Sequence, residues 1–271
     1  MDLTIETPIK TPIETTEAHD TLQNQQVSGL YSRDRQRLVD LENCAQLTPE
    51  LNAWLLDFRK VKLNVKRGSV RLRVTPTADQ RGVWLDFANV DIKTLLNERT
   101  ALDQLRRFAV VEIGQKRKRL IDRGGALKLD DPVLENWFET YDANGIAIPL
   151  YSTIGTFTQP GPIPNRARVR EVLRAMHAHR PQRIAEFGSG IGNFTLPLAS
   201  IAEEVRAFKI DPLAIAGLER SFAASGLSEK VKIYLGNFQV SRKAPPVLEN
   251  LDAILVDPPR SGIGHFLDPI E

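Results

Sequence analysis

The last part of the chain alternates short apolar runs with amphipathic stretches, which is the pattern of strands that alternate with helices. Strands are predicted over 183–187, 205–210, 231–235 and 252–257. Helices are predicted over 162–179, 193–202 and 212–224. Such alternation is typical of a doubly wound α/β fold with a parallel sheet. We therefore predict an incomplete Rossmann-like sheet over residues 151–271.

A different pattern precedes this region. Two alternating segments over 69–74 and 82–87 predict a hairpin, and a strand is expected over 109–113. Thr48 and Pro49 open a predicted helix that reaches Phe58, and a second helix is predicted over 90–108. Residues 29–150 are therefore predicted to form a smaller α+β domain. Residues 1–28 are rich in Thr, Glu and Gln, and we expect a disordered tail there.

Three glycines stand between a predicted strand and a predicted helix. Gly188, Gly190 and Gly192 form the pattern G-x-G-x-G, whereas dinucleotide sites carry G-x-G-x-x-G. The compact spacing is typical of S-adenosyl-L-methionine sites. Glycines alone also fit an ordinary strand-to-helix turn. Support comes from Asp211, which ends the next strand where a carboxylate can accept both ribose hydroxyls, and from Asp257, which ends a third strand.

Charge is unevenly distributed along the chain. Residues 1–28 carry five acids and one base, so the remaining residues hold 35 bases against 29 acids. Basic residues gather over 60–73 and 116–119, where they suit RNA phosphates, and Tyr31, Trp84 or Phe87 could stack on bases. Charged residues that protect exposed strand edges explain the same pattern equally well.

Other features narrow the class of protein. No apolar run approaches the length of a membrane span. The single cysteine, Cys44, excludes an internal disulfide, and a cytoplasmic location is expected. The four histidines do not have the spacing of a metal site, so no metal is expected.

Three motifs together resemble a known family. They are Phe157-Thr158-Gln159, the run from Gly190 to Leu198, and the string Asp257-Pro258-Pro259-Arg260-Ser261-Gly262. The chain resembles the RNA uracil-5-methyltransferases, which make 5-methyluridine in transfer and ribosomal RNA. The resemblance begins near Gly29 and continues to the end of the chain.

The resemblance implies roles for the matching positions. Asp257 would sit beside the flipped uracil, Arg260 would support that loop or bind a phosphate, and Gln159 would touch the cofactor or the base. RNA is the implied partner, and S-adenosyl-L-methionine is the implied cofactor. Its implied binding residues are Gln159, Glu186, Gly188, Gly190, Gly192, Asn193, Asp211, Asn237 and Asp257.

The sequence also departs from the family pattern. The family's reaction needs a cysteine thiolate that attacks C6 of uracil, and the residues that supply it lie beyond the Asp-Pro-Pro-Arg string. Cys44 resembles, by context, the last cysteine of the iron–sulfur cluster that some members hold. Without partner cysteines, no such cluster is expected.

Three hypotheses follow from these observations. The first is a uridine C5 methyltransferase whose nucleophile lies outside these residues. The second is a relative that binds RNA or S-adenosyl-L-methionine without catalysis. The third is an amino-methyltransferase that uses the Asp-Pro-Pro loop, although Arg260 occupies the position where that loop carries an aromatic residue.

Overall fold

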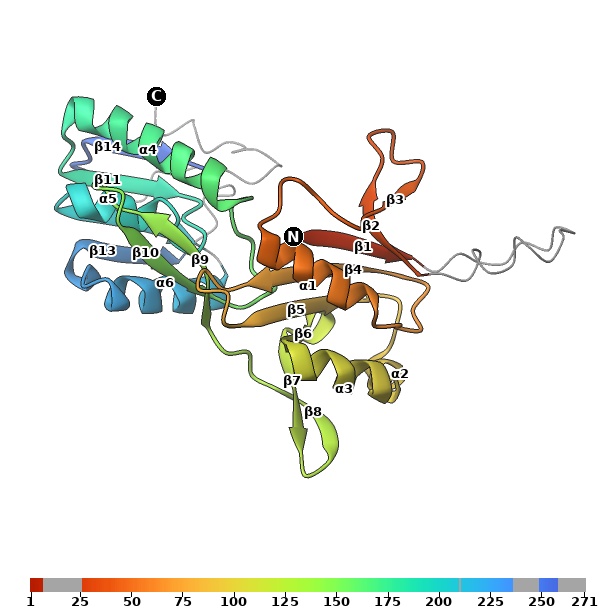
Figure 1. Cartoon of the computed structure of the whole chain (residues 1–271). Coiled ribbons are helices and arrows are strands. Elements are labelled where there is room, and N and C mark those ends of the chain that lie inside the picture. The colour runs from red at the N-terminus through yellow and green to blue at the C-terminus, as the bar shows by residue number, and fades with distance from the viewer. Residues whose placement is uncertain (7–25, 210, 236–248, 258–271) are drawn as a thin grey trace, which may run out of the picture. The chain divides into compact units, whose positions relative to one another are not determined.

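The computed structural model describes residues 1–6, 26–209, 211–235 and 249–257 (Figure 1). It divides the chain into two compact units, Met1–Val133 and Leu134–Glu271. The predicted boundary after residue 150 is therefore too late. The hairpin of β9 (Glu135–Tyr141) and β10 (Ala147–Ser152) belongs to the second unit, because its strands pack against helices α4 (Pro162–His179) and α6 (Pro212–Ala224) of that unit.

The first unit is built on an eight-stranded sheet with the order β3-β2-β1-β4-β5-β6-β7-β8. Neighbouring strands are antiparallel, except that β5 and β6 are parallel. The antiparallel pair β4 and β5 confirms the hairpin that was predicted from segments 69–74 and 82–87. The strands are β1 (Asp2–Glu6), β2 (Val27–Tyr31), β3 (Leu38–Asp40), β4 (Arg67–Val74), β5 (Arg81–Asp86), β6 (Val110–Ile113), β7 (Lys118–Arg123) and β8 (Ala126–Asp130).

The prediction of a disordered tail over residues 1–28 is wrong at both of its ends. Residues 2–6 form β1, which pairs with β2 on one side and β4 on the other. Leu3 and Ile5 are buried between more exposed neighbours, which is the pattern of a strand with one face on the core. Strand β2 begins at Val27. Residues 7–25 of that prediction lie outside the described residues.

The helices of the first unit are α1 (Pro49–Arg59), α2 (Ile92–Asn97) and α3 (Arg99–Phe108), with a short 3₁₀ turn η1 (Gly114–Lys116). Helix α1 begins as predicted, because the Thr48 side chain accepts a hydrogen bond from the Leu51 backbone N–H at 3.3 Å. The helix predicted over 90–108 is two helices. Glu98, with ψ of 40°, leaves the helical conformation and separates them.

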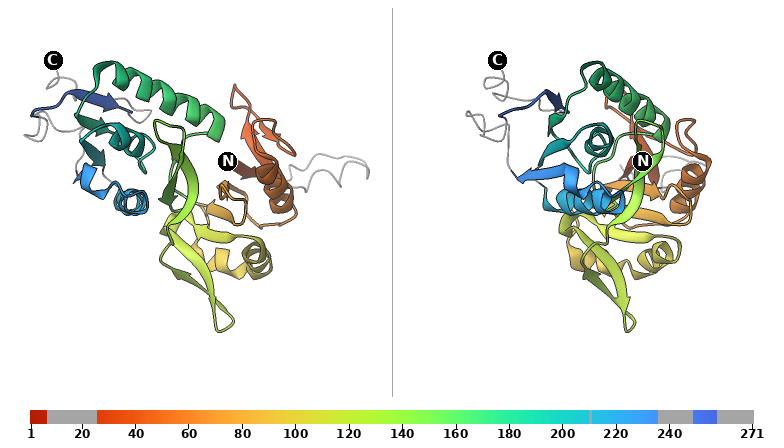
Figure 2. Two further views of the ribbon diagram at one scale, coloured as in Figure 1. Left: turned by 60° about the vertical axis from the view of Figure 1, so that its left-hand side comes forward. Right: turned by 90° about the vertical axis from the view of Figure 1, so that its left-hand side faces the viewer.

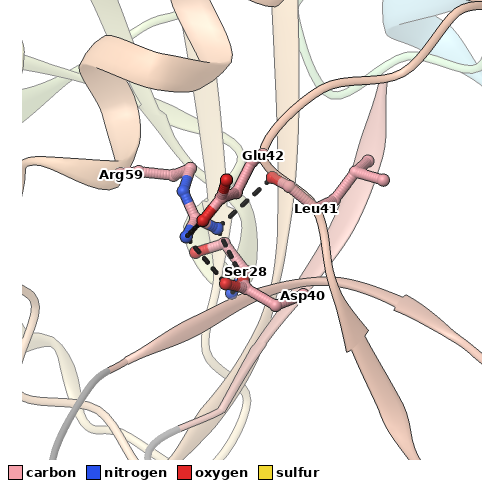
Figure 3. A network of polar contacts seen from close by, with 5 residues as sticks. All are labelled: Ser28, Asp40, Leu41, Glu42 and Arg59. Atoms are coloured by element: carbon pink, nitrogen blue, oxygen red, sulfur yellow. Dashed lines mark hydrogen bonds and ion pairs between the residues drawn. The ribbon is translucent and has the colours of Figure 1, made fainter. Parts of the chain in front are cut away.

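An ion pair ties β3 to the end of α1 (Figure 3). Arg59 donates from both terminal nitrogens to the Asp40 carboxylate at 2.5 and 2.7 Å, and also to the Leu41 carbonyl at 3.3 Å. The Ser28 backbone N–H donates to the same carboxylate at 3.0 Å. These bonds, with that from Arg59 the largest cause, hold the pKa of Asp40 below its ordinary value.

The second unit contains a parallel sheet with the order β13-β12-β11-β14. The predicted Rossmann-like α/β fold is confirmed, with several elements at their predicted bounds. The remaining elements of this unit are α4 (Pro162–His179), β11 (Arg183–Phe187), α5 (Thr195–Ile201), β12 (Glu204–Lys209), α6 (Pro212–Ala224), η2 (Ser228–Lys230), β13 (Val231–Leu235) and β14 (Ala253–Val256).

The two faces of this sheet differ (Figure 2). Helices α4, α5 and α6 share one apolar core with side chains of one face, including Ile184 and Val205. On the other face the rings of Phe187, Phe208 and Tyr234 stack from strand to strand, with centroids 4.5 and 5.2 Å apart. Glu186 directly precedes Phe187 in β11, so its side chain points to the opposite face of the sheet, the face of Ile184.

Candidate functional site

The candidate site lies where the order of the parallel strands reverses. Strand β11 neighbours β12 on one side and β14 on the other. The chain passes from β11 through β12 to β13 at one edge of the sheet, and β14 then lies on the opposite side of β11. Ligands of open α/β sheets bind beside the carboxyl ends of the strands at this switch point. The glycine loop follows β11 and Asp257 follows β14, so the topology brings the two predicted motifs together.

The three glycines each have a conformation that suits glycine. Their φ angles are 87°, 59° and 98° for Gly188, Gly190 and Gly192. A Cβ atom on Gly188 would lie 2.2 Å from the Asp257 carbonyl oxygen, and one on Gly192 would lie 2.6 Å from the Leu218 side chain. Gly188 is therefore required for β11 and β14 to meet, whereas Gly190 has open space around it.

Glu186 is a buried carboxyl group at the end of β11. It is fully buried, and neither of its oxygens has a hydrogen-bond partner. Burial raises its pKa from 4.5 to about 8, an effect that the nearby Thr195 hydroxyl opposes and the Asp257 charge reinforces. The Thr195 hydroxyl is itself buried without a partner of normal geometry. A cation beside these oxygens would lower this pKa and stabilise the carboxylate, so the group suits a cationic ligand.

Asn193 has a structural role in this arrangement. Its side-chain amide exchanges two hydrogen bonds with Asn165 of α4, at 2.8 and 2.9 Å, and both residues are buried. Its carbonyl accepts a bond from the Thr140 hydroxyl at 2.6 Å. Asn193, which was predicted to bind the cofactor, thus fastens the glycine loop to α4 through its side chain and to β9 through its backbone.

Asp211 lies at the end of β12 and also caps α6. Its carboxylate accepts a hydrogen bond from the Leu213 backbone N–H at 2.9 Å, which fixes its position at the edge where the sheet meets ligands. The other two predicted site residues, Asn237 and Arg260, lie outside the described residues.

Gln159 connects Asp257 to a residue that the sequence motifs did not indicate. The Gln159 amide nitrogen donates to Asp257 Oδ2 at 3.2 Å, and Arg168 of α4 donates to Gln159 Oε1 at 2.6 Å. The Asp257 backbone N–H donates to the Phe187 carbonyl at 2.9 Å. Burial raises the pKa of Asp257, and the Arg168 charge opposes this rise.

A groove of about 490 Å³ opens beside Asp257. Its volume is in the range of sites for small organic ligands. Its wall is largely apolar, with charged groups from Arg168, Glu171 and Asp257. The lining residues are Ala167, Arg168, Glu171, Val172, Phe194, Leu255, Val256 and Asp257.

The aromatic residues predicted to stack on RNA differ in their surroundings. Phe87 is fully buried in the core of the first unit, so that prediction is wrong for this residue. Trp84 and Tyr31 are half-buried, with Arg71 and Arg67 over their rings at 5.4 and 5.1 Å. Arginine guanidinium groups already occupy one face of each ring.

The described part of the chain shows neither a metal-binding cluster nor a membrane-spanning helix. Among these residues no three His, Cys, Asp or Glu side chains gather in a group that could hold a metal ion. No helix in the same part is long and apolar enough to span a bilayer. Cys44 is half-buried, and its backbone N–H and carbonyl both bond to the Asn52 side chain at 3.0 Å.

Known proteins that are similar to this chain are named as RNA methyltransferases. The chain is 44% identical over 248 residues to an uncharacterised RNA methyltransferase of Bdellovibrio bacteriovorus, across 90% of this chain and 63% of that protein. It is 26% identical over 253 residues to the 23S rRNA (uracil(1939)-C(5))-methyltransferase RlmD of Nitrosospira multiformis, across 90% of this chain and 54% of the relative. No protein-family model matches.

One solved structure shares the fold over most of the chain. The tRNA (uracil-54, C5)-methyltransferase of Pyrococcus abyssi, solved with S-adenosyl-L-homocysteine, superposes with a TM-score of 0.56 at 15% identity. The match covers 90% of this chain and 60% of that one. The chain thus spans a little over half the length of these relatives.

Proposed function

Because the chain belongs to the RNA (uracil-5-)-methyltransferase family, we propose that it binds S-adenosyl-L-methionine and a uridine of ribosomal or transfer RNA for methylation at C5. The observation that carries the proposal is the meeting of the glycine loop, Glu186 and the Gln159–Asp257 pair at one switch point. RNA modification also supports the expectation of a cytoplasmic location.

The residues at the glycine loop fit the proposed cofactor. When bound, S-adenosyl-L-methionine supplies an electrophilic methyl group on a sulfonium. Its ammonium group suits Glu186, whose two oxygens are buried without partners. The open space at Gly190 lets a ligand approach the backbone, and Asp211 stands at the strand end where a ribose is held.

Gln159 and Asp257 supply the polar groups for the target base. An amide nitrogen donates and a carboxylate accepts, which matches the carbonyl oxygen and the N3–H of uracil. Asp257 lies in the groove that Leu255 and Val256 also line, and Gln159 is hydrogen-bonded to it. A flipped base could lie there against apolar side chains.

The reaction of the family also needs a thiolate, and Cys44 is the only cysteine of these residues. Cys44 belongs to the first unit, whereas the glycine loop and Asp257 belong to the second. We assign to these 271 residues the binding of cofactor and base. The thiolate is assigned to the part of the relatives that this chain does not match.

The test is the product formed by the protein expressed from its complete natural gene. It is incubated with S-adenosyl-L-methionine and unmodified ribosomal and transfer RNA, and the RNA is digested for nucleoside mass spectrometry. We expect 5-methyluridine, and we expect Asp257→Ala to abolish it. Methylation of a nitrogen instead, or RNA binding without methyl transfer, would contradict the proposal.

A further inference from the structure

We propose that Arg168 of α4 sets the orientation of the Gln159 amide and thereby makes the site prefer uracil to cytosine. This inference rests on the proposed function, in which Gln159 and Asp257 contact the target base. Arg168 would act through Gln159 and is therefore a positioning residue.

The hydrogen bonds define the orientation of the amide. Arg168 Nη1 lies 2.6 Å from one terminal atom of Gln159, and Asp257 Oδ2 lies 3.2 Å from the other. A guanidinium group has only donors, so the atom that faces Arg168 must be the amide oxygen. An ionised carboxylate only accepts, so the atom that faces Asp257 must be the nitrogen. Two neighbours of opposite charge thus favour the same orientation.

Arg168 reaches Gln159 because the chain turns sharply between them. Gly161 has a φ of 70° and precedes Pro162, the first residue of α4. The helix then runs back past the turn, which brings Arg168 beside Gln159. The buried pair of Asn165 and Asn193 fixes α4 against the glycine loop one turn before Arg168. An exposed side chain is therefore presented from a backbone that is held in place.

The orientation determines which pyrimidine the site accepts. The Gln159 nitrogen carries two hydrogens, and one of them serves Asp257. The second can donate to O4 of uracil while the Asp257 carboxylate accepts from N3–H. Cytosine presents an amine at position 4 and an acceptor at N3, so both contacts become repulsive. A rotated amide would present its oxygen to that amine and weaken the discrimination.

The experiment compares binding of two short adenosine oligoribonucleotides, one with a central uridine and one with a central cytidine. Fluorescence anisotropy is measured on the full protein with saturating S-adenosyl-L-homocysteine. Arg168→Met removes the donors and keeps an unbranched side chain, and Arg168→Lys restores one donor and the charge. The matched control is Arg170→Met, which removes the same charge from an exposed position of α4.

Because a matched pair of base contacts discriminates against the wrong base, the wild-type protein should prefer uridine by about tenfold. Arg168→Met should lower the preference to within about threefold, with Asp257 supplying what remains. Arg168→Lys should restore part of it, and Arg170→Met should lower both affinities without changing their ratio. Binding of S-adenosyl-L-homocysteine should be unchanged in all variants, which shows that the fold is intact.

Each outcome bears on a different claim. An unchanged preference in Arg168→Met, with normal cofactor binding, overturns the role of Arg168 alone. A wild-type protein that binds both oligonucleotides equally contradicts base recognition by Gln159 and Asp257, and with it the proposed function. A variant that no longer binds S-adenosyl-L-homocysteine contradicts a role confined to the base, because Arg168 would then support the whole site.

Discussion

Replacing Glu186 by glutamine should stabilise the protein at neutral and alkaline pH. The carboxyl group is fully buried with neither oxygen hydrogen-bonded, and burial raises its pKa from 4.5 to about 8. The unfolded chain ionises this group from about pH 4.5, whereas the folded chain holds it protonated up to about pH 8, so stability falls as the pH rises. At about 1.4 kcal/mol per pH unit, the loss is about 3 kcal/mol at pH 7 and about 5 kcal/mol well above pH 8. Glutamine cannot ionise and avoids this loss.

The direction of this pH dependence follows from which state, folded or unfolded, binds the proton more tightly. Because the pKa of Glu186 is higher in the folded than in the unfolded chain, the folded state holds the proton more strongly. The corresponding stability is fully present below about pH 4.5 and is lost as the pH rises through about 8. The assay is urea unfolding of wild type and Glu186→Gln between about pH 5 and about pH 8.5, followed by circular dichroism.

Glu204 of the neighbouring strand β12 is the control. Its carboxylate is paired with Lys232 and Arg206, which lower its pKa, the bond from Lys232 being the largest cause. The stability that Glu204 provides is present above its unfolded pKa and is lost as the pH falls. Glu204→Gln should therefore destabilise the protein at neutral pH, by about 1 kcal/mol. If Glu186→Gln and wild type differ by a constant amount at every pH, the assignment of a raised pKa is refuted.

Three further substitutions test the site and the first unit. Gly188→Ala should weaken binding of S-adenosyl-L-homocysteine by calorimetry about tenfold or more, because Gly188 has a φ of 87° and an alanine there would strain the glycine loop; wild-type affinity would contradict this reasoning. Asn165→Ala should cost about 2 kcal/mol in urea unfolding, since it leaves a buried amide unpaired, and a neutral result would contradict the role of the pair. Arg59→Met should cost about 1 kcal/mol at neutral pH. That cost should vanish in acid as Asp40 becomes protonated, so a loss that persists there would exclude the ion pair.

The sequence predicted the parallel strands and the helices of the second unit well because each carries a local signal. Strand β11 is an apolar run before the first glycine, and α6 begins at Asp211 and Pro212, a cap and a favoured first residue. Strand β1 was missed because only Leu3 and Ile5 reach the core. Its partners in β2 and β4 are more than twenty residues away, so no local pattern distinguishes it from a polar tail.

The candidate site was predictable where it depends on one segment and not where it depends on two. The glycines and Asp257 were recognised from short motifs. Arg168 was missed because its contact with Gln159 depends on the turn at Gly161 and on the rotation of α4. The same limit applies to Asn193, whose partner Asn165 lies 28 residues earlier in the chain and gives no local signal.

The two parts of the site should differ in their sensitivity to change. The cofactor side is built from consecutive residues between β11 and α5, enclosed by the core of the second unit. Asp257 instead follows β14, whose residues are all half-buried and which, among the described residues, pairs only with β11. Its position rests on the Phe187 carbonyl, on the close approach of Gly188 and on Gln159. Changes beside β14 should therefore impair recognition of the base before they impair binding of the cofactor.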